Sequence, residues 1–313
     1  MTVLRWLLPR LGLRLLLLVG VLATVFILVD LLPGNAATQR LGTNRTEEAL
    51  AAAESELGLD KPVYLRFVSW LVGAVQGDFG TSASGREISD LLTHSLPTTL
   101  ITTGIAFGIT AVCSIVIGLW WAFTSSKSFA ARIIDISTTS LIAIPEFVVG
   151  VFLIAVFALW LRILPASSLT GSASGLDWNM YVLPVVTLLV PQVAWNSRIV
   201  RSATSDVCKL PHVDAARLAG ISERRLLWIH IFPLAAPAIA ASLATSSGVL
   251  VAGTVAVETL FNHPGVGLVI ASAVNQRDIP VLVAMLAVTG SIILLLLTIA
   301  DGIKAALSPK GQL

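Results

Sequence analysis

Apolar runs long enough to cross a lipid bilayer recur along this chain, and short polar segments separate them. The first run, residues 11–32, has about 22 residues and would span about 33 Å as a helix that rises 1.5 Å per residue. Charged residues make up 12% of the 313 positions, whereas a soluble domain carries about 25%. We therefore predict an all-α polytopic membrane protein.

Six membrane-spanning helices are predicted, with both termini in the cytoplasm. Lys127 and Arg132 follow the second run, and Arg198 and Arg201 close the fourth. Short basic segments of this kind are typical of the cytoplasmic side of a membrane. The predicted spans cover residues 15–32, 99–123, 133–161, 182–200, 238–257 and 281–300.

The N-terminal run has two interpretations. Arg5, Arg10 and Arg14 precede it, and a basic start before an apolar stretch also marks a cleaved signal peptide. Since the apolar region of a signal peptide has only about 7–15 residues, we favour a retained first span. The chain then divides into a cytoplasmic N-terminus with the first span (1–34), an extracytoplasmic loop domain (35–97) and a transmembrane core (98–313).

The segment 35–97 carries an acidic excess, which fits the outer side of the membrane. Within it, residues 46–57 are predicted to form a short helix that Thr46 can cap. Residues 67–75 are apolar enough to lie against the membrane surface, and residues 77–80 read as a turn.

A polar stretch, residues 202–237, lies between the fourth and fifth spans and is predicted to face the cytoplasm. Val213 to Ala219 contains good helix formers, and Gly220 can end that helix at little steric cost. Ser222 can cap a second helix, with Glu223 in its first turn. The pattern predicts a compact helix–glycine–helix elbow that another protein could contact, although a plain connection between spans is the alternative.

Glu146 is the most informative charge within a predicted span. A carboxylate at the centre of a membrane helix costs about 2.5–3.5 kcal/mol, so it should face a bundle interior or a water-filled path. The preceding Pro145 loosens the local backbone hydrogen bonding. Glu146 is therefore either a pathway or gate residue, or a structural charge that a neighbouring helix or subunit satisfies.

The sequence lacks the motifs of several functional classes. No Gly-x-x-x-x-Gly-Lys-Ser/Thr phosphate loop occurs, so we expect no nucleotide hydrolysis by this chain. Neither a His-Glu-x-x-His nor a paired-cysteine motif occurs, and the four histidines are scattered, so we expect no metal or cofactor site. The net charge of +2 is too small to indicate a nucleic-acid partner.

Several short motifs follow one another along the chain. They are Leu31-Leu32-Pro33-Gly34, Leu57-Gly58-Leu59-Asp60-Lys61-Pro62, Gly77-Asp78-Phe79-Gly80, Leu96-Pro97-Thr98-Thr99, Ile144-Pro145-Glu146-Phe147, Asp214-Ala215-Ala216 with Gly220, and Val257-Glu258-Thr259-Leu260-Phe261 with Pro264-Gly265-Val266-Gly267. In their order and spacing, over nearly the whole chain, they resemble the first permease of the dipeptide/oligopeptide/nickel group of ABC importers. One departure is Asp214, where a Glu or a Thr/Arg pair is usual; this leaves the docking detail open.

The resemblance implies a type I importer permease fold in the cytoplasmic (inner) membrane. It implies a heterodimer with a second, homologous permease, two ATP-binding subunits that carry the ATP and Mg²⁺, and an extracytoplasmic substrate-binding protein. Short peptides are the expected substrate. Nickel or a metal chelate is the alternative within this architecture, and a stand-alone channel or an intramembrane enzyme is the alternative outside it.

The resemblance also assigns roles to residues. The segment 202–237 becomes the loop that couples the permease to an ATPase. Its candidate docking residues are Asp214, Ala215, Ala216, Arg217, Ala219, Gly220, Ser222 and Glu223. The candidates for the translocation pathway are Pro145, Glu146 and Phe147, and those that face the binding protein are Asp78, Phe79, Asn262 and Pro264.

Overall fold

A computed structural model describes residues 2–31, 46–56, 61–125, 128–168 and 178–307 of the chain. These residues are almost entirely helical, and the only strand-like pairing among them is one isolated antiparallel bridge between Thr81 and Glu87. The helices are α1 (Thr2–Asp30), α3 (Glu47–Glu56), α4 (Val63–Val75), α5 (Ile88–Phe123), α6 (Phe129–Ala143), α7 (Glu146–Leu153), η1 (Ile154–Trp160), α8 (Asn179–Cys208), α9 (Pro211–Leu218), α10 (Glu223–Leu226), η3 (Leu227–Ile231), α11 (Phe232–Leu260), α12 (Val266–Gln276) and α13 (Ile279–Leu307).

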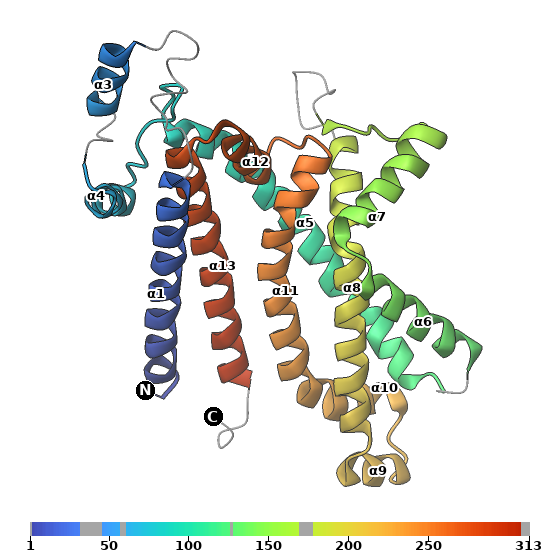
Figure 1. Cartoon of the computed structure of the whole chain (residues 1–313). Coiled ribbons are helices and arrows are strands. Elements are labelled where there is room, and N and C mark those ends of the chain that lie inside the picture. The colour runs from blue at the N-terminus through green and yellow to red at the C-terminus, as the bar shows by residue number, and fades with distance from the viewer. Residues whose placement is uncertain (1, 32–45, 57–60, 126–127, 169–177, 308–313) are drawn as a thin grey trace.

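Five helical stretches of the described residues are long and apolar enough to cross a membrane. They lie in α1, α5, α8, α11 with its preceding turns, and α13 (Figure 1). A sixth candidate is the pair formed by α6 and α7–η1, which passes the same test when the two parts are taken together. Counting this pair as one span gives the six predicted spans.

The third predicted span is bent by 103° between Ala143 and Glu146. Pro145 causes this break because its ring disfavours helical geometry in the residue before it. Ile144 accordingly has an extended backbone (φ −87°, ψ 124°), and α7 starts afresh after Pro145. The sequence predicted one span over 133–161 with loosened backbone hydrogen bonding at Pro145, and the structure shows a break at that point.

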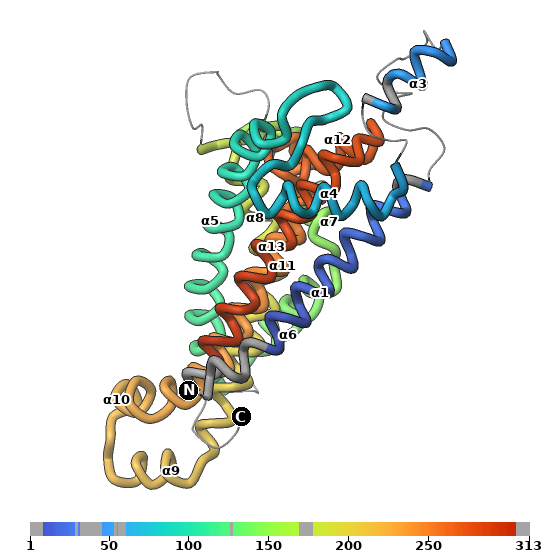
Figure 2. Tube along the Cα trace, turned by 90° about the vertical axis from the view of Figure 1, so that its left-hand side faces the viewer, coloured from blue at the N-terminus to red at the C-terminus, as the bar shows by residue number. Residues whose placement is uncertain are grey.

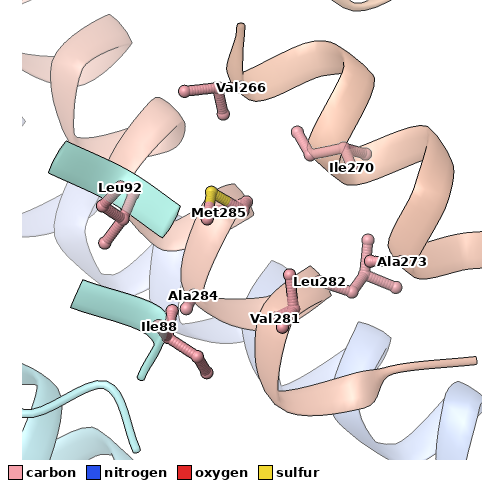
Figure 3. Packing of buried hydrophobic residues seen from close by; sticks show 9 residues of the cluster. All are labelled: Ile88, Leu92, Val266, Ile270, Ala273, Val281, Leu282, Ala284 and Met285. Carbon is pink, nitrogen blue, oxygen red and sulfur yellow. The ribbon is translucent and has the colours of Figure 1, made fainter. Parts of the chain in front are cut away.

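The second span starts earlier than the predicted residue 99. Helix α5 begins at Ile88 and continues through Pro97. Its first turns are helical because Ile88 and Leu92 are buried against α12 and α13, where they pack near Met285 (Figure 3). This contact joins segments far apart in the chain, so local sequence patterns could not reveal it.

Between the fifth and sixth predicted spans, where no helix was predicted from the sequence, the structure contains the 11-residue helix α12. Val266, Ile270 and Ala273 line the buried face of α12. They pack on the start of α13 within the cluster drawn in Figure 3. The helix is too short to span a membrane, and this tertiary contact stabilises it.

The two ends of the bundle carry different elements. α3, α4 and α12 lie at one end, and α9 and α10 lie at the other, where α1 begins and α13 finishes (Figures 1 and 2). The predicted short helix is confirmed as α3, and Thr46 Oγ1 accepts a hydrogen bond of 3.3 Å from the Ala49 N–H. α4 has no buried residue, and its position on the membrane surface stays a prediction.

Small and polar residues join the long helices, as is usual in membrane bundles. Gly118 of α5 lies directly against Val200 and the Ser197 carbonyl of α8. Asn196 of α8 donates to Ser246 of α11 over 2.7 Å. These close contacts hold α5, α8 and α11 together.

Candidate functional site

The predicted helix–glycine–helix elbow is present in residues 211–226. α9 starts at Pro211, whose fixed φ suits a first helical turn. Gly220 has a φ of +80° and would meet no neighbouring atom within 4 Å if it carried a Cβ. The left-handed backbone, rather than lack of space, therefore favours glycine at this position.

Arg217 holds the two arms of the elbow together. Its Nε donates to Glu223 Oε1 over 2.8 Å, and its Nη1 lies 3.4 Å from Asp214 Oδ1. The hydrogen bond to Glu223 raises the pKa of Arg217, so the guanidinium stays charged. Since all three side chains are largely exposed, the ion pairs orient the elbow more than they stabilise the fold.

The inner and outer faces of the elbow differ. Val213 and Leu226 are fully buried against the ends of α8 and α11. Ala216 also packs inward, whereas Ala215 and Ala219 are exposed. The apolar Leu218 at the end of α9 is 90% exposed, so the elbow presents an apolar tip that none of the described residues covers.

The second arm differs from the expected capped helix. Ser222 occupies the N-cap position of α10, but its side chain makes no capping hydrogen bond. After one α-turn, the chain continues through the π-helical η3 into α11, so that 223–260 form one helical stretch. Pro233 and Pro237 at the start of α11 lack the N–H groups of a regular helix.

Glu146 opens α7 and turns toward α11. Its carboxylate occupies the space beside Gly253, where any Cβ would collide with it. Glu146 is half-buried, and none of the described residues offers it a hydrogen bond or an ion pair. The flanking Pro145 and Phe147 are exposed. A neighbouring helix therefore makes room for this carboxylate without neutralising it.

Glu258, at the far end of α11, is fully buried and was not among the predicted site residues. Its Oε1 accepts a 2.7 Å hydrogen bond from Thr99 Oγ1 of α5, and its Oε2 accepts a 2.6 Å bond from the Gly267 N–H. The carboxylate thus caps the first turn of α12 from outside, where free N–H groups and the helix dipole favour a negative charge.

His263 is buried in the turn after α11, where its backbone N–H donates a 2.8 Å hydrogen bond to the Glu258 carbonyl, and it was also missed. Its Nε2 lies 3.0 Å from Thr102 Oγ1, and its Nδ1 lies 2.9 Å from Ser168 Oγ. The Tyr181 ring meets the imidazole edge-on, with the ring centroids 4.8 Å apart. Burial lowers the pKa of His263 to about 4. The neutral imidazole therefore joins α5, α8 and the segment after η1 to the turn that follows α11.

That turn presents residues alternately inward and outward. Phe261, His263 and Gly265 are buried, whereas Asn262 and Pro264 are exposed. Asn262 adopts a left-handed backbone with φ +48°, a conformation that asparagine tolerates. The two predicted binding-protein contacts therefore project from a turn whose intervening residues are fixed beneath it.

The other predicted contacts at this end behave differently from each other. Asp78 is exposed and closes the expected tight turn by accepting a 2.9 Å hydrogen bond from the Gly80 N–H. Phe79 is partly buried against the cluster of Figure 3. Asp78 is thus open to a partner, while the Phe79 ring helps to hold the turn on the bundle.

One signal in the sequence could have identified Glu258. It is the only acidic side chain, Lys or Arg between Arg225 and Arg277. An isolated carboxylate in so long an uncharged stretch needs partners. His263 offered no comparable signal, since its partners lie in other helices.

Comparison with known proteins identifies the family of this chain. Residues 114–311 match the family described as the binding-protein-dependent transport system inner membrane component, and residues 3–103 match the N-terminal region of such membrane components. The chain belongs to this family. It is therefore a multi-pass membrane protein of a transport system that depends on a binding protein, which confirms the importer-permease resemblance.

Similar curated proteins cover nearly the whole chain. A probable peptide ABC transporter permease, y4tP of Sinorhizobium fredii, is 29% identical over 299 residues, which are 91% of this chain and 92% of the relative. The glutathione transport permease GsiC of Salmonella choleraesuis is 32% identical over 305 residues, 94% of each chain. GsiC of Escherichia coli K12 is 31% identical over 295 residues, 91% of each.

A solved structure shows the same fold. A chain of the MetNI methionine ABC transporter, in an inward-facing conformation, superposes with a TM-score of 0.58 at 17% identity. The match covers 70% of this chain and 97% of the other. The helical core is therefore an ABC importer permease fold.

Proposed function

We propose that this permease is one of two homologous membrane subunits of an ATP-driven importer of short peptides. The loop 202–237 would dock on one of two ATP-binding subunits. The observation that carries the docking role is the elbow itself, because an exposed Leu218 on a tip braced by Arg217 is suited to a partner's groove. ATP and Mg²⁺ would be bound by the partner subunits.

The substrate class rests on the relatives. One is named a peptide transporter permease and others are named glutathione transport permeases. Both substrates are short peptides in the broad sense, since glutathione is a tripeptide with one γ-linkage. These relatives give no support to the nickel or metal-chelate alternative, and we do not adopt it.

The described helices provide a path for coupling. The elbow continues through η3 into α11, and α11 ends two residues after the buried Glu258. At 1.5 Å per residue, the 29 residues of α11 extend about 44 Å. A displacement of the elbow by an ATPase would therefore move one end of a stretch whose other end fixes the outer turn. This arrangement supports alternating access by rigid-body movement.

The positions of other residues in the structure support further roles. Glu146, with Pro145 and Phe147, lies at the break of the third span and would line or gate the pathway. Asp78, Asn262 and Pro264 project at the end opposite the elbow and would face the binding protein. With the elbow in the cytoplasm, both termini would be cytoplasmic and the membrane would be the inner membrane.

Replacing Gly220 tests the docking role. Gly220→Val imposes a strained left-handed backbone on the elbow, and we expect co-purification with the ATP-binding subunits and peptide uptake to fall together. Gly85→Val is the matched control for assembly, since Gly85 also has φ +79° and open space around it but lies at the other end. Wild-type uptake and assembly of Gly220→Val would contradict the docking role.

A second experiment separates an importer from a stand-alone channel. The purified chain in liposomes should move no labelled dipeptide until the ATP-binding subunits, the second permease and the binding protein are added with ATP. Transport or chemical modification of the peptide by the chain alone would refute the proposed function.

A further inference from the structure

A basic pocket lies beside α8 at the end of the molecule that carries the elbow. Its volume is about 450 Å³. Trp121 comes from the end of α5, and all other lining residues come from successive turns of α8 or, for Lys209, from its C-cap. They are Arg198, Ile199, Arg201, Ser202, Ser205, Asp206 and Lys209.

Arg201 is the cation of this pocket that remains available. Its guanidinium carbon lies 4.1 Å from the centroid of the buried Trp121 ring, so the ring supports one face of the planar group. Arg198 is engaged by Asp135 at 2.9 Å and Lys209 by Asp206 at 3.3 Å. No carboxylate of the described residues pairs with Arg201.

An apolar pocket of about 280 Å³ lies on the adjoining turns of the same helices. On α5, Ile117 is one turn from Trp121, and on α8, Ser197 directly precedes Arg198. The remaining wall is α6, which Arg198 also contacts through Thr138 at 3.2 Å. The other lining residues are Ile133, Ile134, Ser137, Leu141, Leu189, Val190, Val193 and Ala194.

The depth of the two pockets matches the layers of a bilayer. From Asn179, where α8 begins, to Arg198 is 19 residues, or about 29 Å of helix, close to the hydrocarbon thickness of about 30 Å. The apolar pocket therefore falls within the hydrocarbon layer. The basic pocket falls at the headgroup level, where tryptophan is also enriched.

We propose that this α5–α6–α8 groove binds one anionic phospholipid of the leaflet on the elbow side. Its phosphodiester would lie against Arg201, with the Ser202 and Ser205 hydroxyls as further donors, and an acyl chain would fill the apolar pocket. Basic pockets between membrane helices bind anionic headgroups in this way. A free phosphate would use only the basic half, and an apolar segment of a partner would use only the other.

The proposal rests on the membrane orientation given under the proposed function, and it adds a consequence for the elbow. Lys209 at the rim of the pocket is two residues before Pro211, where α9 starts. A bound lipid would therefore contact the base of the coupling loop and link its position to the composition of the leaflet.

Lipid binding is tested on the full chain in detergent by native mass spectrometry with phosphatidylglycerol and phosphatidylcholine. We expect a preference for phosphatidylglycerol that Arg201→Gln lowers about fivefold, since one basic side chain contributes about 1 kcal/mol at a membrane surface. Arg132→Gln is the matched control, because Arg132 is an exposed cation on the neighbouring α6 that does not line the pocket.

The apolar half is tested separately. Val193→Trp should fill the pocket and reduce retention of phosphatidylglycerol while leaving every charge in place. Equal losses for Arg201→Gln and Arg132→Gln would overturn the proposal in favour of general surface attraction. Displacement by millimolar inorganic phosphate, or wild-type retention by Val193→Trp, would overturn it in favour of a soluble anion.

Assembly with the ATP-binding subunits is measured on the same variants. Loss of lipid retention with intact assembly would show that the groove is separate from the docking contact, so that either site can fail without the other. If the wild-type chain assembles and transports but shows no preference for phosphatidylglycerol, the lipid site is wrong while the importer function stands.

Discussion

Thr99 Oγ1 donates a 2.7 Å hydrogen bond to Glu258 Oε1 and accepts a 2.8 Å bond from the Val266 N–H. One hydroxyl therefore joins α5, the end of α11 and the start of α12. Because Glu258 and Val266 are buried, water could not replace the Thr99 hydroxyl as the hydrogen-bond partner of the carboxylate and the N–H. This hydroxyl group thus holds three helices together at the end of the bundle opposite the elbow.

Thr99→Val should destabilise the protein. The change removes a donor from a buried carboxylate and an acceptor from a buried N–H, and each unsatisfied group costs about 1–3 kcal/mol. Thermal unfolding in detergent should show the loss, and Thr99→Ser should recover most of it. Thr103→Val is the matched control, since the Thr103 hydroxyl, one turn later, is buried without a partner among the described residues. Equal losses at both positions would contradict this account.

The buried imidazole of His263 should make stability depend on pH. Burial lowers the pKa of His263 to about 4 in the folded protein, whereas the pKa of an exposed histidine is about 6.5. Between these values the unfolded chain binds a proton that the folded chain does not. Stability from this group is therefore complete above pH 6.5 and is lost as pH falls to about 4, by about 3 kcal/mol in total.

Melting curves of wild type and His263→Gln across pH 4–8 check this expectation. The variant should be less stable at pH 7 but should lose less stability on acidification. His94→Gln serves as control, because His94 is exposed. If the wild type and His263→Gln show the same acid dependence, another group is responsible.

Gly253→Ala tests whether the position of the Glu146 carboxylate matters for transport. A Cβ at residue 253 would collide with the end of the Glu146 side chain, which is flexible and can swing away. We expect little change in melting temperature but a fall in peptide uptake toward that of Glu146→Gln. Gly248→Ala on the same helix makes only ordinary contacts at 3.5 Å or more and should transport normally. If Gly253→Ala takes up peptide as the wild type does, the position of the Glu146 carboxylate does not matter for transport.

Gly118→Ala should separate α5 from α8. A Cβ there would lie 2.5 Å from Val200 Cβ and 2.8 Å from the Ser197 carbonyl oxygen, and neither can move without its helix. Such overpacking costs about 1–3 kcal/mol. Gly108→Ala, where a Cβ meets nothing within 4 Å, should instead stabilise α5 by about 0.5–1 kcal/mol. Denaturation in detergent should show a lower free energy of unfolding for Gly118→Ala than for the wild type and a higher one for Gly108→Ala.

The sequence predicted those features that local chemistry controls. The elbow followed from a polar stretch with Gly220 between two helix-forming segments, and the break in the third span followed from Pro145. The six spans followed from the length of the apolar runs. In each case the deciding residues are neighbours in the chain, so a pattern in the sequence is sufficient.

The features that the sequence did not predict depend on distant contacts. Glu258 and Thr99 are 159 positions apart, and His263 and Thr102 are 161 positions apart. The early start of α5 at Ile88 likewise requires α12 and α13 to cover it. No local pattern encodes such pairs, although the isolation of Glu258 in an uncharged stretch marked it as a residue that needs partners.

Leu218 provides the sharpest test of the docking tip. Because its side chain is 90% exposed, Leu218→Ser should change the stability of the isolated chain by no more than about 0.5 kcal/mol. If the tip inserts into a groove of an ATP-binding subunit, the same change should weaken assembly at least about tenfold, as expected for an interface anchor worth 1.4 kcal/mol or more. Leu226→Ser is the opposite case, since Leu226 is fully buried; it should destabilise the chain by about 2–5 kcal/mol. If Leu218→Ser assembles normally, the docking contact does not lie at the end of α9.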